Sequence, residues 1–178
     1  REGDITDFTG GVKDIETKTI RAVGDPKKRF EEDALRMMRA IRISCQIGFL
    51  IEQNTFEAMV DKAPLIKKIS GERIRDELFK ILVTPVADDG IRLLKNSGLL
   101  AHIMPEVLEG VDMEQKGHHV YDVWTHMLMA LKHCQSQNPI TRLATLLHDV
   151  GKPKSLAIRN GERTFHNHEI IGARMALG

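Results

Sequence analysis

Beyond residue 25 the apolar positions of the chain recur every three or four residues, which is the period of an amphipathic helix. Helix start and stop signals divide this pattern into segments. Asp25 and Pro26 fit the N-cap and first helical positions of one segment, and Gly48 is the type of residue that ends it. The spacing predicts helices over residues 26–47, 53–61, 71–82, 87–96, 121–134 and 140–150, and a last helix from residue 168.

The first 24 residues lack the helical period. Residues 4–8 read as extended chain, Thr9-Gly10-Gly11 as a turn, and residues 18–23 alternate roughly as a short strand does. We therefore predict a mainly α protein with a short β segment at its N-terminus. A soft boundary near residues 110–117 separates a helical body, residues 25–112, from a second all-helical part, residues 113–178.

Composition narrows the class of protein. Hydrophobic residues make up 42% and charged residues 29% of the 178 positions, as in ordinary globular domains. The net charge of +1 gives no evidence for nucleic-acid binding, so any basic surface must be local. Cys45 and Cys134 match no metal or redox spacing, exclude a disulfide framework and favour a reducing, cytoplasmic compartment.

No apolar run reaches the ~18 residues of a membrane span, and no signal peptide opens the chain. We therefore expect no membrane partner. Because the chain begins without Met and ends within a predicted helix, we expect it to be part of a longer protein.

The predicted helix 26–47 carries an ordered set of charges. Three-residue steps place Asp33, Arg36 and Arg39 on one side of a helix, with Arg42 one turn further. An exposed pair of this kind is ordinarily a solvated face that contributes ~0.2–0.5 kcal/mol. However, a carboxylate that accepts and a guanidinium that donates in a rigid fork can also pair with the edge of a base, while further arginines hold phosphates.

Several sequence blocks occur in a characteristic order: Thr9-Gly10-Gly11-Val12-Lys13-Asp14-Ile15, Ile20-Arg21-Ala22-Val23-Gly24-Asp25-Pro26, Glu32-Asp33-Ala34-Leu35-Arg36 and Ser70-Gly71-Glu72-Arg73-Ile74-Arg75-Asp76-Glu77-Leu78. This order resembles the bacterial tRNA nucleotidyltransferases, or CCA-adding enzymes, and their poly(A) polymerase relatives. The resemblance implies that Asp33 and Arg36 read the base of CTP or ATP, that Arg39 and Arg42 contact the nucleotide, and that tRNA is the acceptor.

In that family, nucleotidyl transfer uses Mg²⁺ held by an Asp-x-Asp pair in an N-terminal palm domain. No Asp-x-Asp precedes Asp33 in this chain. We therefore expect residues 1–24 to be the C-terminal edge of the palm, residues 25–112 to be the neck and body, and the catalytic carboxylates of nucleotidyl transfer to be absent from the chain.

Histidines crowd the last third of the chain, where all of them except His102 lie. His148 and Asp149 follow an apolar helical segment, and adjacent helix residues diverge by about 100°, so one ion between them needs ligands from neighbouring helices. His126, on another apolar segment, is the candidate partner. A lone histidine on an apolar face is more often a core residue, which is the alternative for His126.

The blocks His118-His119-Val120-Tyr121-Asp122-Val123-Trp124-Thr125-His126, Leu147-His148-Asp149-Val150-Gly151-Lys152-Pro153 and Phe165-His166-Asn167-His168-Glu169 resemble the HD superfamily of metal phosphohydrolases. The resemblance implies a partial HD domain over residues 113–178. The resemblance also implies that His126, His148 and Asp149 are ligands of a divalent transition metal. His168 is a candidate ligand of a second metal, and Lys152 a candidate contact to substrate phosphate.

Three classes of function remain open. The first is a segment of a tRNA nucleotidyltransferase that adds C and A, with an A-adding or poly(A)-adding relative as its near alternative. The second is a metal-dependent HD phosphohydrolase that acts on its own. The third is a non-catalytic helical module that binds RNA.

Overall fold

The computed structural model describes residues 6–114, 121–159 and 162–177. In chain order its elements are α1 (Gly11–Glu16), β1 (Thr19–Ile20), α2 (Pro26–Glu32), α3 (Leu35–Ile47), β2 (Leu50–Ile51), α4 (Gln53–Lys62), the 3₁₀ helix η1 (Ala63–Lys68), α5 (Gly71–Leu82), α6 (Ala87–Asn96), α7 (Leu100–Ile103), the 3₁₀ helix η2 (Pro105–Gly110), α8 (Val123–His133), α9 (Pro139–Leu147), α10 (Lys152–Ser155), β3 (Ala157–Arg159), β4 (Glu162–Thr164) and α11 (His168–Leu177). The mainly α fold class is confirmed. None of the helices in this described part is long and apolar enough to cross a membrane.

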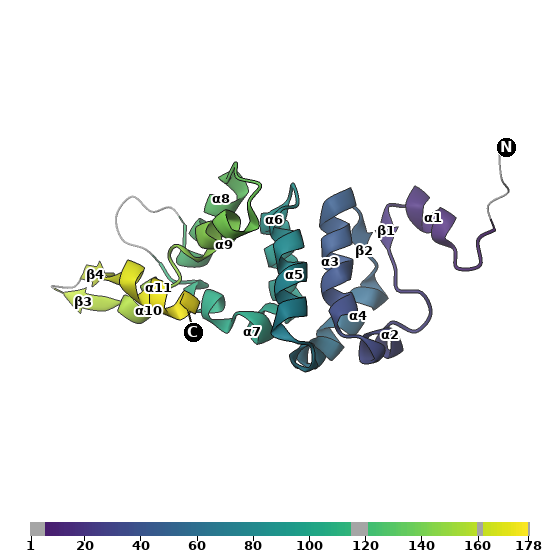
Figure 1. The fold of residues 1–178 in the computed structure, drawn as a ribbon, viewed down its shortest axis with the longest axis horizontal. Coiled ribbons are helices and arrows are strands. Elements are labelled where there is room, and N and C mark those ends of the chain that lie inside the picture. The colour runs from purple at the N-terminus through teal and green to yellow at the C-terminus, as the bar shows by residue number, and fades with distance from the viewer. Residues whose placement is uncertain (1–5, 115–120, 160–161, 178) are drawn as a thin grey trace.

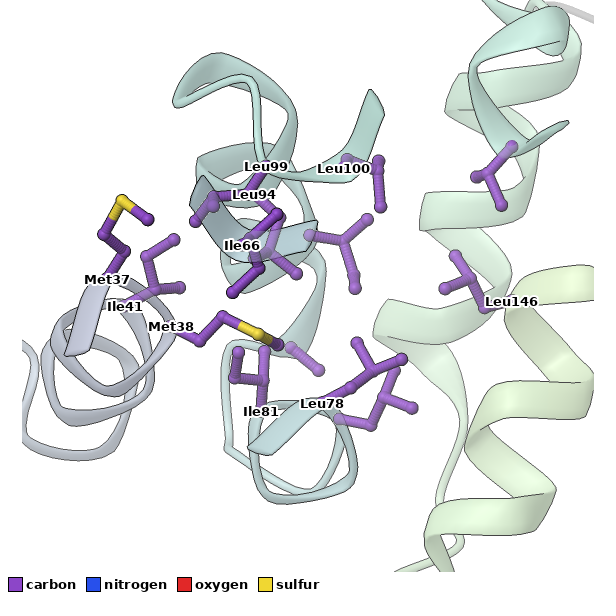
Figure 2. Close-up of a cluster of buried hydrophobic side chains, with 14 of the residues drawn as sticks. Met37, Met38, Ile41, Ile66, Leu78, Ile81, Leu94, Leu99, Leu100 and Leu146 are labelled. Atoms are coloured by element: carbon purple, nitrogen blue, oxygen red, sulfur yellow. The ribbon is translucent and has the colours of Figure 1, made fainter. Parts of the chain in front are cut away.

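The helices are arranged along one axis, from α1 at one end, through α3 and α5, to α11 and the β3–β4 hairpin at the other (Figure 1). One apolar core continues through the middle of this arrangement. Met38 and Ile41 of α3 meet Ile81 of α5, and Leu146 of α9 reaches the same cluster from the far side (Figure 2). All four side chains have 0% exposure, so α9 is fixed relative to the body by close packing.

The prediction of one helix over residues 26–47 is wrong at Asp33, where the chain breaks into α2 and α3. Asp33 adopts an extended conformation, with φ −152° and ψ 102°. Its carboxylate accepts a hydrogen bond from the Leu35 amide at 3.1 Å. A short acidic side chain competes with the helix for backbone donors in this way, which explains why an Asp within a helical pattern can interrupt it.

The strands also differ from expectation. β1 lies within the predicted strand 18–23, but it pairs in parallel with β2, for which no strand was predicted. Directly after the predicted turn at residues 9–11, residues 11–16 form helix α1, for which no element was predicted. The predicted domain boundary at residue 24 stays a prediction. Strand β1 lies before this boundary and β2 lies after it, so their pairing connects the two predicted parts. Of the predicted extended segment 4–8, residues 4 and 5 lie outside the described residues.

The last third is not all-helical as predicted, because β3 and β4 form an antiparallel hairpin with Ala157 opposite Thr164. The sequence signal for it is Asn160-Gly161, a dipeptide typical of hairpin turns, which stands between the two strands. The hairpin lies between α10 and α11 in the sequence and therefore separates the two elements that carry Lys152 and His168.

A buried carboxylate ties α3 to α5. Glu77 is 4% exposed and accepts hydrogen bonds from Arg42 at 2.8 Å and from Lys80 at 3.0 Å, with Arg39 4.0 Å away. Burial alone raises the pKa of Glu77, but the hydrogen bonds from Lys80 and Arg42 outweigh burial and hold that pKa below its usual range.

We predict that Glu77→Gln lowers the free energy of unfolding by about 2 kcal/mol at pH 7, because charged hydrogen bonds between α3 and α5 are lost. The folded-state pKa of Glu77 is depressed, so its stabilisation is present above the unfolded pKa of about 4.3 and disappears as the pH falls through the folded pKa. Urea unfolding at pH 7 and at pH 3 measures both effects. Glu72→Gln, on the same helix at a side chain that is 78% exposed, is the matched control and should be neutral.

Candidate functional site

The break between α2 and α3 places the carboxylate of Asp33 where two helices meet. Its Oδ1 atom accepts from the Leu35 amide, and its Oδ2 atom accepts from Arg73 of α5 at 3.0 Å. The guanidinium of Arg39 lies 3.9 Å from Oδ2. Burial raises the pKa of Asp33, but the Leu35 and Arg73 hydrogen bonds outweigh it and hold that pKa below its usual range. Asp33 is therefore an ionised acceptor in a fixed orientation.

The predicted arginines do not gather around Asp33 as one cluster. Arg36 donates to the Glu32 carboxylate and to the carbonyl of Arg29, the latter at 3.0 Å. Arg42 is directed at Glu77 and at Gln46. Of the three predicted arginines, Arg39 is the one whose guanidinium lies near the Asp33 carboxylate. The roles of all four residues in nucleotide binding stay predictions.

A cavity of about 210 Å³ opens beside this region. Arg29, Arg36 and Arg39 line it together with apolar side chains that include Phe30 and Ile43, whereas Asp33 and Arg42 do not line it. Guanidinium groups beside an apolar wall suit a ligand that combines phosphates with a flat ring.

No role was predicted for Arg73 and Glu77, although both lie in the block Ser70–Leu78 that carries the family resemblance. Arg73 is 40 residues from Asp33, and Glu77 is 35 residues from Arg42. No local pattern connects residues this far apart; only the packing of α5 against α3 brings them together.

The histidine cluster is built from two helix ends. His126 lies in the first turn of α8, which Asp122 caps by accepting from the Thr125 amide at 2.8 Å. His148 ends α9, and Asp149 follows it. The two Nε2 atoms of the histidines lie 3.1 Å apart, and they lie 3.4 Å and 3.2 Å from Asp149 Oδ2. The structure thus brings the three predicted ligand atoms to one point.

A fourth and a fifth group face the same carboxylate. Lys152 Nζ lies 2.7 Å from Asp149 Oδ2, and His168 Nε2 lies 3.4 Å from Oδ1. Asp149 itself is only 3% exposed. Burial raises the pKa of Asp149, but hydrogen bonds with His148 and Lys152 outweigh burial and hold that pKa well below its usual range, and the bond to Asp149 raises the pKa of His148. His118 and His119 lie outside the described residues.

Two of the histidines have an assignable tautomer. His148 Nδ1 lies 2.8 Å from the Thr145 carbonyl, and His168 Nδ1 lies 2.7 Å from the Phe165 carbonyl. A carbonyl only accepts, so each Nδ1 carries a proton, and the Nε2 atom of each ring is the one directed at Asp149. A set of two imidazole nitrogens and one carboxylate oxygen within 4.8 Å of one another fits a divalent transition metal.

Comparison with known proteins finds a matching family for the helical body and another for the part of the chain that carries the histidine cluster. Residues 48–110 match the model of the family described as "Probable RNA and SrmB- binding site of polymerase A", and residues 117–178 match the HD domain. An A-adding tRNA nucleotidyltransferase of Deinococcus radiodurans is 37% identical over 98% of the chain. The predicted family is confirmed. This chain is related to the bacterial tRNA nucleotidyltransferases.

Two further relatives match shorter stretches of the chain. A CCA-adding enzyme of Leuconostoc mesenteroides is 37% identical over 71% of it. The crystal structure of the Bacillus stearothermophilus CCA-adding enzyme in complex with CTP is 40% identical over 58% of it, with a TM-score of 0.56. The chain spans 43% of the Deinococcus relative, 33% of the Leuconostoc relative and 27% of the Bacillus structure, so it corresponds to part of each.

We predict that Arg73→Ala raises the pKa of Asp33, because the nearest cation stabilising the carboxylate is removed. A carboxyl-carbon NMR titration measures this pKa directly. Arg75→Ala is the matched control, since Arg75 lies on the same helix but pairs with Asp76 at 2.9 Å. An Asp33 pKa that is the same in Arg73→Ala and in the wild type would show that Arg73 does not hold this carboxylate.

Proposed function

We propose that this chain is the nucleotide-selecting and HD-containing part of a bacterial tRNA nucleotidyltransferase that adds C and A to the 3′ end of tRNA. The observation that carries the proposal is the Asp33 carboxylate, held ionised and oriented just before the helix whose Arg36 and Arg39 line a cavity. CTP, ATP and tRNA are the corresponding partners, and a cytoplasmic location follows from this role.

The base-reading chemistry can be derived from these residues. Cytosine and adenine each present an exocyclic amino group beside a ring nitrogen. The Asp33 carboxylate would accept from the amino group, and the Arg36 guanidinium would donate to the ring nitrogen. Arg36 must leave its partner Glu32 to do so. Arg39 would hold phosphate, and Arg42 would contribute chiefly by fixing α3 through Glu77 while remaining a candidate nucleotide contact.

The chemical step of nucleotidyl transfer would take place on a palm domain outside this chain, with Mg²⁺ held there. A large apolar groove fits such a neighbour. It is about 700 Å³ in volume and is lined by Phe8, Ile15 and Ile47, whose exposed fractions are 92%, 67% and 52%. Contiguous apolar surface of this kind is typical of a contact with another domain.

A near alternative is an A-adding enzyme. The Deinococcus relative, which aligns over 98% of the chain, carries that name. The paired Asp33 and Arg36 suit both bases, so they do not separate the two activities.

For the HD region we propose a metal centre at His126, His148 and Asp149, with His168 as a candidate ligand of a second ion. A bound divalent metal there would supply a Lewis acid and an activated water for phosphoester hydrolysis. His148 and His168 would offer their Nε2 atoms, whose orientation the Thr145 and Phe165 carbonyls fix. Lys152, which is 8% exposed, would meet the substrate phosphate from the same side.

In the full-length protein, we predict that Asp33→Ala or Arg36→Ala reduces discrimination for C and A by at least tenfold, because a buried polar base edge loses a partner worth ~1–3 kcal/mol. The measurement is incorporation of each nucleotide into tRNA lacking its 3′ end. Arg75→Ala, on the exposed face of α5, should match the wild type. Wild-type fidelity in both Asp33→Ala and Arg36→Ala would refute base reading by this pair.

We predict that His148→Ala lowers the affinity for Mn²⁺ at least tenfold, measured by titration calorimetry, while nucleotide addition by the full-length protein is unchanged. The two regions lie on different helices, so loss of one ligand atom should not reach Asp33. His133→Ala, at an exposed position on α8, is the control. Equal Mn²⁺ affinity of the wild type, His148→Ala and His133→Ala would show that His148 is not a metal ligand.

A further inference from the structure

The backbone of α11 approaches the turn after Asp149 unusually closely. A Cβ atom added to Gly151 would lie 2.1 Å from the His168 carbonyl oxygen and 2.5 Å from the Gly172 amide nitrogen. These two glycines therefore pack backbone against backbone, with Gly151 itself buried.

The conformation of Gly151 does not by itself require a glycine. Its φ of −81° and ψ of −11° lie in the right-handed helical region, which any residue adopts. The missing side chain is therefore needed for the approach of α11 and not for the shape of the turn. Gly172 contributes from the other side, where a Cβ atom would lie 3.3 Å from the Gly151 amide nitrogen.

This contact between Gly151 and α11 connects the segments that carry Asp149 and His168. Gly151 is two residues after Asp149, and His168 is the first residue of α11. A side chain at Gly151 would need about 1 Å more room to reach ordinary van der Waals distance, and close-packed backbones leave none. Metal-ligand distances tolerate only ~0.2 Å. A displacement of α11 large enough to admit a Cβ atom would therefore take His168 away from Asp149.

We propose that Gly151 is a positioning residue, whose backbone contact with α11 sets His168 against Asp149 Oδ1 and so makes His168 available to a second ion beside the His126, His148 and Asp149 centre. The inference rests on the proposed metal function of His126, His148 and Asp149. It predicts that Gly151 acts on metal binding only through His168.

The test is Mn²⁺ titration calorimetry on the chain, with near- and far-UV circular dichroism to verify folding. Gly151→Ala should lower the Mn²⁺ affinity or stoichiometry as much as His168→Ala does, by about tenfold or by the loss of one ion. The double variant Gly151→Ala/His168→Ala should lose no more than either single variant. Gly71→Ala is the matched control, because a Cβ atom there meets nothing within 4 Å.

If Gly151→Ala does not fold, Gly172→Val decides the matter, since it pushes α11 outward without changing the turn that carries Asp149. It should reproduce the Mn²⁺ binding of His168→Ala. Wild-type Mn²⁺ binding by a folded Gly151→Ala or Gly172→Val protein, or additive losses in the double variant, would overturn the positioning role alone. A wild-type chain that binds no Mn²⁺ would overturn the proposed metal function, and the positioning role with it.

Discussion

The buried carboxylate of Asp149 is the constraint around which the C-terminal half of the chain is organised. A buried anion is costly unless donors and cations surround it, and Asp149 draws His126, His148, Lys152 and His168 from α8, α9, α10 and α11 to within 3.4 Å of its oxygens. Helix ends that are separate in the sequence are thereby held at one point. The same arrangement directs the Nε2 atoms of His126 and His148 at one point beside the carboxylate, and these are the atoms that would bind a transition metal.

In the N-terminal half of the chain, the Asp33 carboxylate is likewise held by donors from separate elements. The Asp33 carboxylate interrupts a helix, accepts from the Leu35 amide at the start of the next one and is held by Arg73, so its charge and orientation are set before any ligand arrives. The apolar core that packs Met38 and Ile81 together also includes Leu146 of α9 (Figure 2). Both carboxylates therefore lie next to helices of a single close-packed core, Asp33 just before α3 and Asp149 just after α9, although their proposed chemistries differ.

Local signals and long-range contacts differ in how well the sequence predicts them. Helical periodicity located α5 and α6 almost to the residue, and the ordered blocks around Asp33 and His148 identified the family. The break at Asp33 was missed because a capping side chain competes with helix propensity on nearly equal terms. The β1–β2 pairing and the role of Arg73 were missed because they depend on contacts between residues more than 30 positions apart. Gly151 lies in the block around His148, but the need for a glycine there is apparent only once α11 lies against it.

The central claim for the clustered histidines is that they hold a metal ion. Anomalous diffraction from crystals grown with Mn²⁺ tests it most directly. The account predicts a peak within roughly 2.0–2.3 Å of His126 Nε2, His148 Nε2 and an Asp149 oxygen. A well-ordered cluster with no anomalous peak, and with the Asp149 carboxylate contacted only by Lys152 and the imidazoles, would contradict it and leave these side chains as a structural ion-pair network.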